Sequence, residues 1–362
     1  MPISQAPACG NRLTRIDNLT GVRGIVALWV VLFHFNTLGM GRVIARGSFG
    51  VDIFFILSGL VLSIVYTRNL PDRFQWIWYK SFLARRFSKL YPMHLLTFLA
   101  MASLIAVGRL THYRFTADVD NSFWTAFCNL LMMHACGLTQ QLSWNAPSWS
   151  VSAEWFAYCA MFAPMVLLLR RVSLARLFLL GIVLWISLLL FCHSFLGSSI
   201  LLTTNGVLRI IPEFFCGYLL FRTLQVHRPR QGDYYTCVGF ALMGVVVWND
   251  NSMEWLLLPA VMLLLTGLHS GGPLSDVLFG NRPTVILGEA SYSIYLVQVF
   301  PVIVAHRLIA RVGEANHLAA ECIACATTLS VAACGVFSYL YIEEPLRKRL
   351  LRILSSTPQS NA

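Results

Sequence analysis

The strongest constraint on the fold is a series of apolar segments of about the length that crosses a lipid bilayer as an α-helix. Roughly 20 apolar residues span the hydrocarbon core. Ten such segments occur, at residues 22–38, 49–67, 90–107, 151–169, 174–195, 207–224, 235–248, 254–269, 291–309 and 318–341, the seventh being the least secure by length. The sequence therefore predicts an all-α integral membrane protein with about ten transmembrane helices.

Composition excludes a soluble domain of this size. Charged residues make up 12% of the chain and hydrophobic residues 57%, whereas a soluble domain has about 25% charged residues. The net charge of +11 does not indicate a nucleic-acid partner, because excess Lys and Arg in a membrane protein marks the cytoplasmic loops. The cysteines show no CxxC pairing with histidines, so we expect neither a metal site nor a permanently bound cofactor.

The basic residues also predict the orientation. If alternate loops are assigned to the cytoplasm, beginning with the N-terminus, 19 Lys and Arg residues fall there and 6 on the opposite side. Both termini are then cytoplasmic. We expect a cytoplasmic segment at 1–21, a membrane domain at 22–342 with a long external loop at 108–150, and a basic cytoplasmic tail at 343–362. Neither a cleavable signal peptide nor an appended soluble domain is expected.

Two ionisable side chains, Arg23 and His34, interrupt the first apolar stretch. Such residues are expensive at membrane depth and are functional candidates for that reason. Their separation of eleven residues is about 20° past three helical turns, so they share one helix face. They lie about 16 Å apart along the axis. A cation at one end and a proton-transfer group near the other would suit an extended anionic substrate with a reactive tip.

Further ionisable residues gather at two depths. With this topology, the residues near the outer ends of the spans are His34, Asp52, Glu154, Arg209 and Glu213. Buried charges need partners, and this set can supply them mutually. Each has a structural alternative: Asp52 as a helix cap, Arg209 with Glu213 as an intramembrane pair, and His34 as a packing residue.

A basic group gathers at the inner ends of the spans. Arg23 begins the first span, and Arg85, Arg86 and Lys89 precede the third. Clustered cations form an anion site, and arginine suits phosphate especially well. The alternative is that the three residues of the third segment only contact anionic lipid.

Seven motifs, in this order, resemble those of the acyltransferase-3 family of integral-membrane acyltransferases. They are Leu19 to Phe35 with the Arg…His pair, Gly50 to Gly59, Arg85 to Pro92, Pro147 to Glu154, Arg209 to Gly217, Ser291 to Leu296 including Tyr295, and Ile342 to Pro345. Two departures occur. Lys89 stands where arginine is usual and loses its bidentate fork, and Trp155 follows Glu154 where a second acid is usual. The hydrolase-like domain fused to some members is not present in this sequence.

The resemblance implies transfer of an acyl group, usually acetyl, from cytoplasmic acyl-CoA to a hydroxyl of a cell-surface glycan, in a bacterial inner membrane. Arg23, Arg86 and Lys89 would hold the donor phosphates. His34 would act as general base, with Asp52 or Glu154 orienting it or stabilising its cation. The polar residues Arg209, Glu213 and Tyr295 are further site candidates. The acceptor, the acyl chain length, a covalent intermediate and the oligomeric state stay open.

A different class of function fits the same features. Ten spans with intramembrane His, Asp, Glu and Arg also describe a proton-coupled transporter or flippase. The sequence shows neither repeated halves nor a matched pair of broken helices, which disfavours that alternative. A structural or sensory role is disfavoured because so many ionisable groups share one depth.

Overall fold

The computed structural model describes residues 10–112, 120–196, 205–227, 229–249, 253–312 and 316–355, and this part of the chain is helical without a β-strand. The first helices are α1 Gly10–Phe33, α2 Arg42–Ala45, α3 Gly50–Tyr66, α4 Trp76–Leu110, α5 Phe123–Leu130, α6 Trp149–Phe156, α7 Ala163–Leu168, α8 Leu174–Phe191 and α9 Gly206–Val226. The others are α10 Gly232–Trp248, α11 Leu257–Ser270, α12 Pro273–Phe279, α13 Arg282–Glu289, α14 Ser291–Val297, α15 Val299–Val312, α16 His317–Ser338 and α17 Glu344–Ser355. Two π-helical turns, Ala157–Phe162 and Tyr339–Glu343, join α6 to α7 and α16 to α17.

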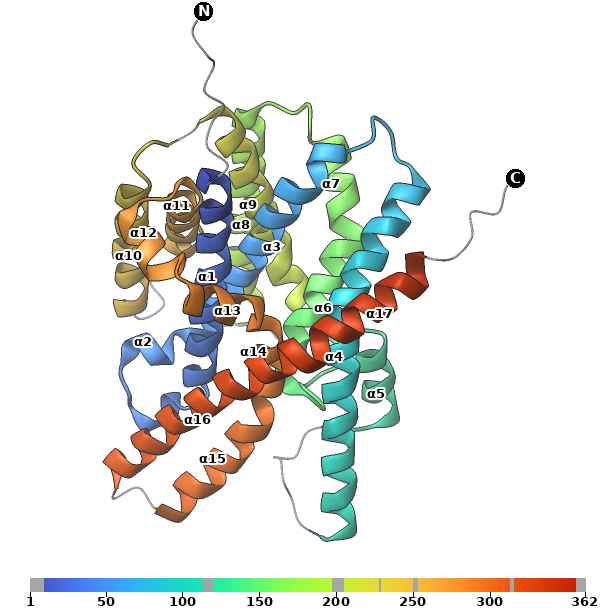
Figure 1. Ribbon diagram of the computed structural model, residues 1–362, viewed down its shortest axis with the longest axis vertical. Coiled ribbons are helices and arrows are strands. Elements are labelled where there is room, and N and C mark those ends of the chain that lie inside the picture. Colours follow the sequence, from blue (N-terminus) through green and yellow to red (C-terminus); the bar gives the residue numbers. More distant parts are fainter. Residues whose placement is uncertain are drawn as a thin grey trace, which may run out of the picture.

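The helices form a bundle around α3 and α9 (Figure 1). One group, α10, α11 and α12, lies to one side of α1, and α4 to α7 lie to the other (Figure 1). The helices α15 and α16 form an antiparallel pair, and α17 continues from α16 to pack across α4. Polar residues from α3, α4, α6, α9 and α14 therefore come together inside the bundle.

The apolar helices have the lengths expected of a multi-pass membrane protein. Among the described residues, five helices are long and apolar enough to cross a bilayer, and up to seven if each of two sharply bent pairs counts as one span. All ten predicted segments coincide with helical residues, but several of these helices, such as the 17-residue α10, fall short of that criterion. The number ten and the orientation of the termini stay predictions.

Two glycines allow α3 and α9 to touch through their backbones. A Cβ on Gly59 would collide with the carbonyl of Phe214, and a Cβ on Gly217 would collide with the carbonyl of Ile56. Small residues let membrane helices approach this closely. The two glycines are thus points of close helix packing, and the contact fixes the spacing between the residues that α3 and α9 bring to the interior.

The last long helix of the chain is continuous across its π-helical turn. Residues His317–Ser355 form one helical stretch of 39 residues, about 58 Å long at 1.5 Å per residue. This exceeds the roughly 30 Å of a bilayer core. The predicted tail after Ser355, the start of the predicted N-terminal segment at 1–9, and residues 113–119 of the predicted external loop lie outside the described residues.

Candidate active site

The short helix α6 connects the polar elements of the bundle. Ser150 donates its hydroxyl hydrogen to the Tyr295 hydroxyl of α14, at 3.0 Å. Ser152 donates to the carbonyl of Met132, at 2.9 Å. The ring of Trp149 lies 5.6 Å from the guanidinium carbon of Arg209. About one turn at the start of α6 thus contacts α14, α9 and the segment after α5.

A buried charge cluster joins α3 to α9. The Arg209 guanidinium binds the Asp52 carboxylate in a bidentate manner, with Nε–Oδ1 at 2.9 Å and Nη2–Oδ2 at 2.5 Å. Its Nε also lies 3.5 Å from Oε1 of Glu213. All three side chains are buried. Bidentate pairing is the geometry that best offsets desolvation of a carboxylate. The structure therefore brings these three predicted residues together, as a network inside the protein.

The balance of charge in this cluster is unequal. One guanidinium faces two carboxylates, and Asp52 takes both of its short bonds. Neither carboxylate oxygen of Glu213 has a hydrogen-bond partner among the described residues. Among the described residues, Glu213 is thus held by its ion pair with Arg209 at 3.5 Å, without a hydrogen bond.

Glu154 lies in a different environment from the one predicted. Its Oε1 accepts hydrogen bonds from the hydroxyls of Ser58 on α3 and Tyr158, four residues further along the chain. The charge of Arg86 on α4 acts on the same Tyr158 hydroxyl. Arg86 in turn donates to the Tyr66 hydroxyl at 3.0 Å. Glu154 thus belongs with the basic residues of α4.

Lys89 is paired with an acid of the π-helical turn that precedes α17. Its ammonium forms an ion pair with Glu343, which also accepts a hydrogen bond from the Ser293 hydroxyl at 2.6 Å. Arg23 is close enough for its charge to act on Lys89. Within the described part of the chain, Arg23 itself has neither a hydrogen bond nor an ion pair. Of the three predicted donor-binding cations, only Lys89 forms an ion pair with a described residue; Arg86 donates to a tyrosine hydroxyl, and Arg23 has no polar partner in that part of the chain.

His34 lies one residue beyond the end of α1 and is oriented by the backbone. Its Nδ1 is 2.9 Å from the carbonyl oxygen of Val30. A carbonyl only accepts hydrogen bonds, so Nδ1 carries the proton of the neutral ring and Nε2 is the basic atom. The Nε2–H of His306 on α15 donates to the carbonyl of His34, at 3.0 Å.

Asp52 and Glu154, expected to orient His34 or to stabilise its cation, bind other side chains among the described residues. Asp52 is bound by Arg209, and Glu154 by Ser58 and Tyr158. A common depth in the membrane does not by itself bring side chains into contact, because the rotation of each helix about its axis decides which neighbour a side chain meets. A buried carboxylate also gains more from a bidentate guanidinium than from a neutral imidazole.

Several residues near the site were not predicted. Tyr158 follows Glu154 by four residues, and this spacing places both on one helix face, so the sequence held a signal for it. Glu343 and His306 come from distant parts of the chain and gave no such signal. His134, in the segment after α5, is also buried and bonds Ser148 through Nε2 at 3.0 Å. Burial, together with neighbouring His94, lowers the pKa of His134 to about 3.

Comparison with protein families and with known proteins gives the following similarities. A family model described as an acyltransferase domain matches residues 16–339. The exopolysaccharide production protein ExoZ of Rhizobium meliloti is 25% identical over 329 residues, which cover 88% of this chain and 95% of that protein. The acyltransferase MdmB of Streptomyces mycarofaciens is 31% identical over 180 residues, or 46% of this chain and 43% of that protein.

A third relative is a Staphylococcus aureus protein whose name provisionally describes an O-acetyltransferase. It is 21% identical over 381 aligned residues, which cover 96% of this chain and 60% of that protein. The chain thus spans less than half of MdmB and somewhat more than half of the staphylococcal relative. No solved structure matches the chain at comparable significance.

Proposed function

The chain belongs to the acyltransferase-3 family, and we propose that it is a membrane-bound O-acyltransferase. It moves an acyl group, acetyl in the simplest case, from cytoplasmic acyl-CoA to a hydroxyl of a cell-surface glycan. The similarity to an exopolysaccharide production protein over nearly the whole of both chains supports a glycan acceptor. The location proposed is the bacterial cytoplasmic membrane, with residues 22–342 as the catalytic domain between two cytoplasmic ends.

The observation that carries this proposal is the orientation of His34. Because Nδ1 is engaged by the Val30 carbonyl, the lone pair of Nε2 is the basic site of the neutral ring. In the proposed reaction, Nε2 takes the proton of the acceptor hydroxyl while its oxygen attacks the thioester carbonyl. The new C–O bond forms, the C–S bond breaks, and the thiolate of CoA leaves and takes up a proton.

The donor phosphates are proposed to bind the unpaired cation Arg23 together with Arg86. Both are guanidinium groups suited to phosphate. The charge of Arg23 acts on Lys89, and Arg86 precedes Lys89 by three residues on α4. Lys89 is assigned a supporting role, because Glu343 already satisfies its charge. Glu154 is proposed to hold Tyr158 beside Arg86, and the Asp52–Arg209–Glu213 cluster, with Tyr295 nearby, to hold the bundle.

The direct test is the variant His34→Gln, with O-acetylation of the surface glycan measured by mass spectrometry. General-base catalysis typically contributes 10²- to 10⁴-fold, so we expect a loss of at least about a hundredfold at unchanged protein level. The control is His317→Gln, which changes an exposed histidine at the start of α16. Normal acetylation in His34→Gln contradicts the proposal.

A second measurement separates this function from transport. An acyltransferase releases free CoA and leaves an ester on its acceptor, whereas a transporter or flippase moves its substrate without covalent change. The purified protein in lipid vesicles is incubated with acetyl-CoA and a glycan acceptor. Movement of the glycan across the vesicle membrane without release of CoA would favour the transporter.

A further inference from the structure

The C-terminal helix α17 has two distinct exposed faces. At 100° per residue, one face carries the basic residues Lys348, Arg349 and Arg352, and the other carries the apolar residues Leu346, Leu350, Ile353 and Leu354. Of the apolar side, Leu346 is 36%, Ile353 66% and Leu354 39% exposed. A helix in water would bury such residues, so the apolar face indicates a lipid environment next to the basic one.

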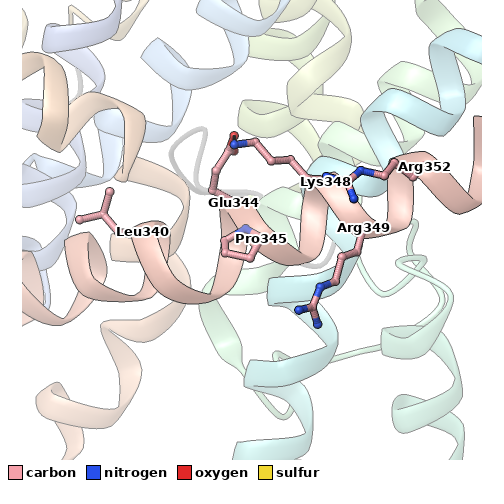
Figure 2. A pocket seen from close by; sticks show the side chains of 6 residues that line it. All are labelled: Leu340, Glu344, Pro345, Lys348, Arg349 and Arg352. Carbon is pink, nitrogen blue, oxygen red and sulfur yellow. Dashed lines mark ion pairs between the residues drawn. The ribbon is translucent and has the colours of Figure 1, made fainter.

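The basic face lines a shallow pocket of about 400 Å³ along the helix. Figure 2 shows Lys348 reaching back towards Glu344, while Arg349 points to the other side of the helix. Glu344 is paired with Lys348 at 3.3 Å and with Arg347 at 2.7 Å. Arg349 and Arg352 form no ion pair with the residues that the structure describes. The pocket thus presents two unpaired guanidinium groups.

We propose that α17 binds the phosphate headgroups of anionic phospholipids at the membrane surface. The basic face supplies charge-assisted hydrogen bonds to phosphate, and the adjoining apolar face enters the acyl-chain boundary. This combination is typical of helices that lie in the headgroup region. The position along the chain supports the same partner, since α17 is the C-terminal part of the candidate span His317–Ser355 and basic clusters at the ends of spans bind anionic lipid.

The surface is held rigidly against the bundle. Immediately before α17, Glu343 is bound by Lys89 of α4 and by Ser293 of α14. The helix itself packs against α4. Because α17 is fixed in this way, its basic face keeps one orientation relative to the membrane helices. This inference concerns a lipid surface and does not depend on the proposed acyl transfer.

The test compares lipid retention by the full-length protein in native mass spectrometry. Purified wild-type protein, R349Q/R352Q and the control R109Q/R311Q are incubated with phosphatidylglycerol or phosphatidylcholine. Both double variants remove two exposed positive charges. We expect R349Q/R352Q to bind phosphatidylglycerol roughly thirtyfold more weakly, as two basic residues at a membrane surface imply, and the control to match the wild type.

Equal retention of phosphatidylglycerol by the two double variants would overturn the proposal. So would equal retention of both lipids by the wild-type protein, a comparison that needs no variant to fold. A third arm adds excess coenzyme A. If it displaces phosphatidylglycerol from the wild-type protein, the basic face takes the phosphates of the acyl donor and the lipid assignment is wrong.

Discussion

At the scale of single residues, the structure divides the predicted cations by their partners. Lys89 and Arg209 are held by carboxylates that the protein itself supplies, Glu343 and Asp52. Among the described residues, Arg23 is not, and Arg86 contacts the hydroxyl and the ring of Tyr66. A bound anion gains most from cations that have no carboxylate partner within the protein. Substitution of Arg23 or Arg86 should therefore weaken anion binding, whereas substitution of Lys89 should affect stability.

The first prediction follows from this difference. Arg23→Gln should weaken binding of CoA by tenfold or more while leaving thermal stability unchanged, because a charge-assisted hydrogen bond contributes about 1.5–3 kcal/mol. Lys89→Met should instead destabilise the fold by about 3–5 kcal/mol, since it strands Glu343. Calorimetric CoA titration and thermal unfolding of the purified protein measure the two effects.

The double variant Lys89→Met/Glu343→Leu serves as the control. Removing both members of a buried pair is often neutral, so stability should return, and CoA binding should be close to that of the wild type. A double variant that is stable but no longer binds CoA would show that Lys89 is a phosphate ligand after all.

The buried His134 gives a prediction about pH. Its pKa of about 3 lies below the ordinary value near 6.5. Between these values the unfolded chain binds a proton that the folded chain does not. Stability should therefore fall as pH is lowered from 6.5 towards 3, by up to about 1.4 kcal/mol per pH unit.

The variant His134→Asn removes the group that takes up this proton on unfolding. It should therefore flatten the pH dependence of the unfolding temperature between pH 7 and 4.5. His317→Gln, at an exposed site, should leave the slope unchanged. An identical slope in wild-type protein and His134→Asn would mean that His134 does not stay neutral in the folded state.

At the scale of elements, the contact between α3 and α9 positions the charge cluster. Gly59 and Gly217 bring the two backbones together, and Asp52 and Arg209 lie two turns away on the same helices. Widening the helix pair would lengthen the bidentate contact. The ion pair between Asp52 and Arg209 therefore depends on the close packing of the α3 and α9 backbones.

Gly59→Leu should destabilise the protein by at least about 1–3 kcal/mol, the usual range for overpacking, because its side chain meets backbone atoms that cannot rotate away. Gly244→Ala on α10 is the control, since a Cβ there meets nothing within 4 Å; it should be neutral or slightly stabilising. Thermal unfolding in detergent compares them, and equal unfolding temperatures would contradict the close contact.

At the scale of the whole molecule, the sequence predicted where helices lie better than which side chains contact each other. Apolar length located helices at all ten predicted segments, and the spacing of Arg209 and Glu213 predicted their common face. The contact of Glu154 with Ser58 and that of His34 with His306 could not be found this way. They depend on how helices pack, and the residues involved lie 96 and 272 positions apart in the chain.

The π-helical turn at Tyr339–Glu343 has a further consequence for the neighbouring acids Glu343 and Glu344. Glu343 is bound inside the bundle by Lys89 and Ser293, while Glu344 forms ion pairs with Arg347 and Lys348 at the surface. The number of residues in the turn therefore determines which side of α17 faces the bundle. Deleting a single residue there would rotate α17 by about 100°, which would place Glu344 where Glu343 now lies and turn the basic face away from its present position.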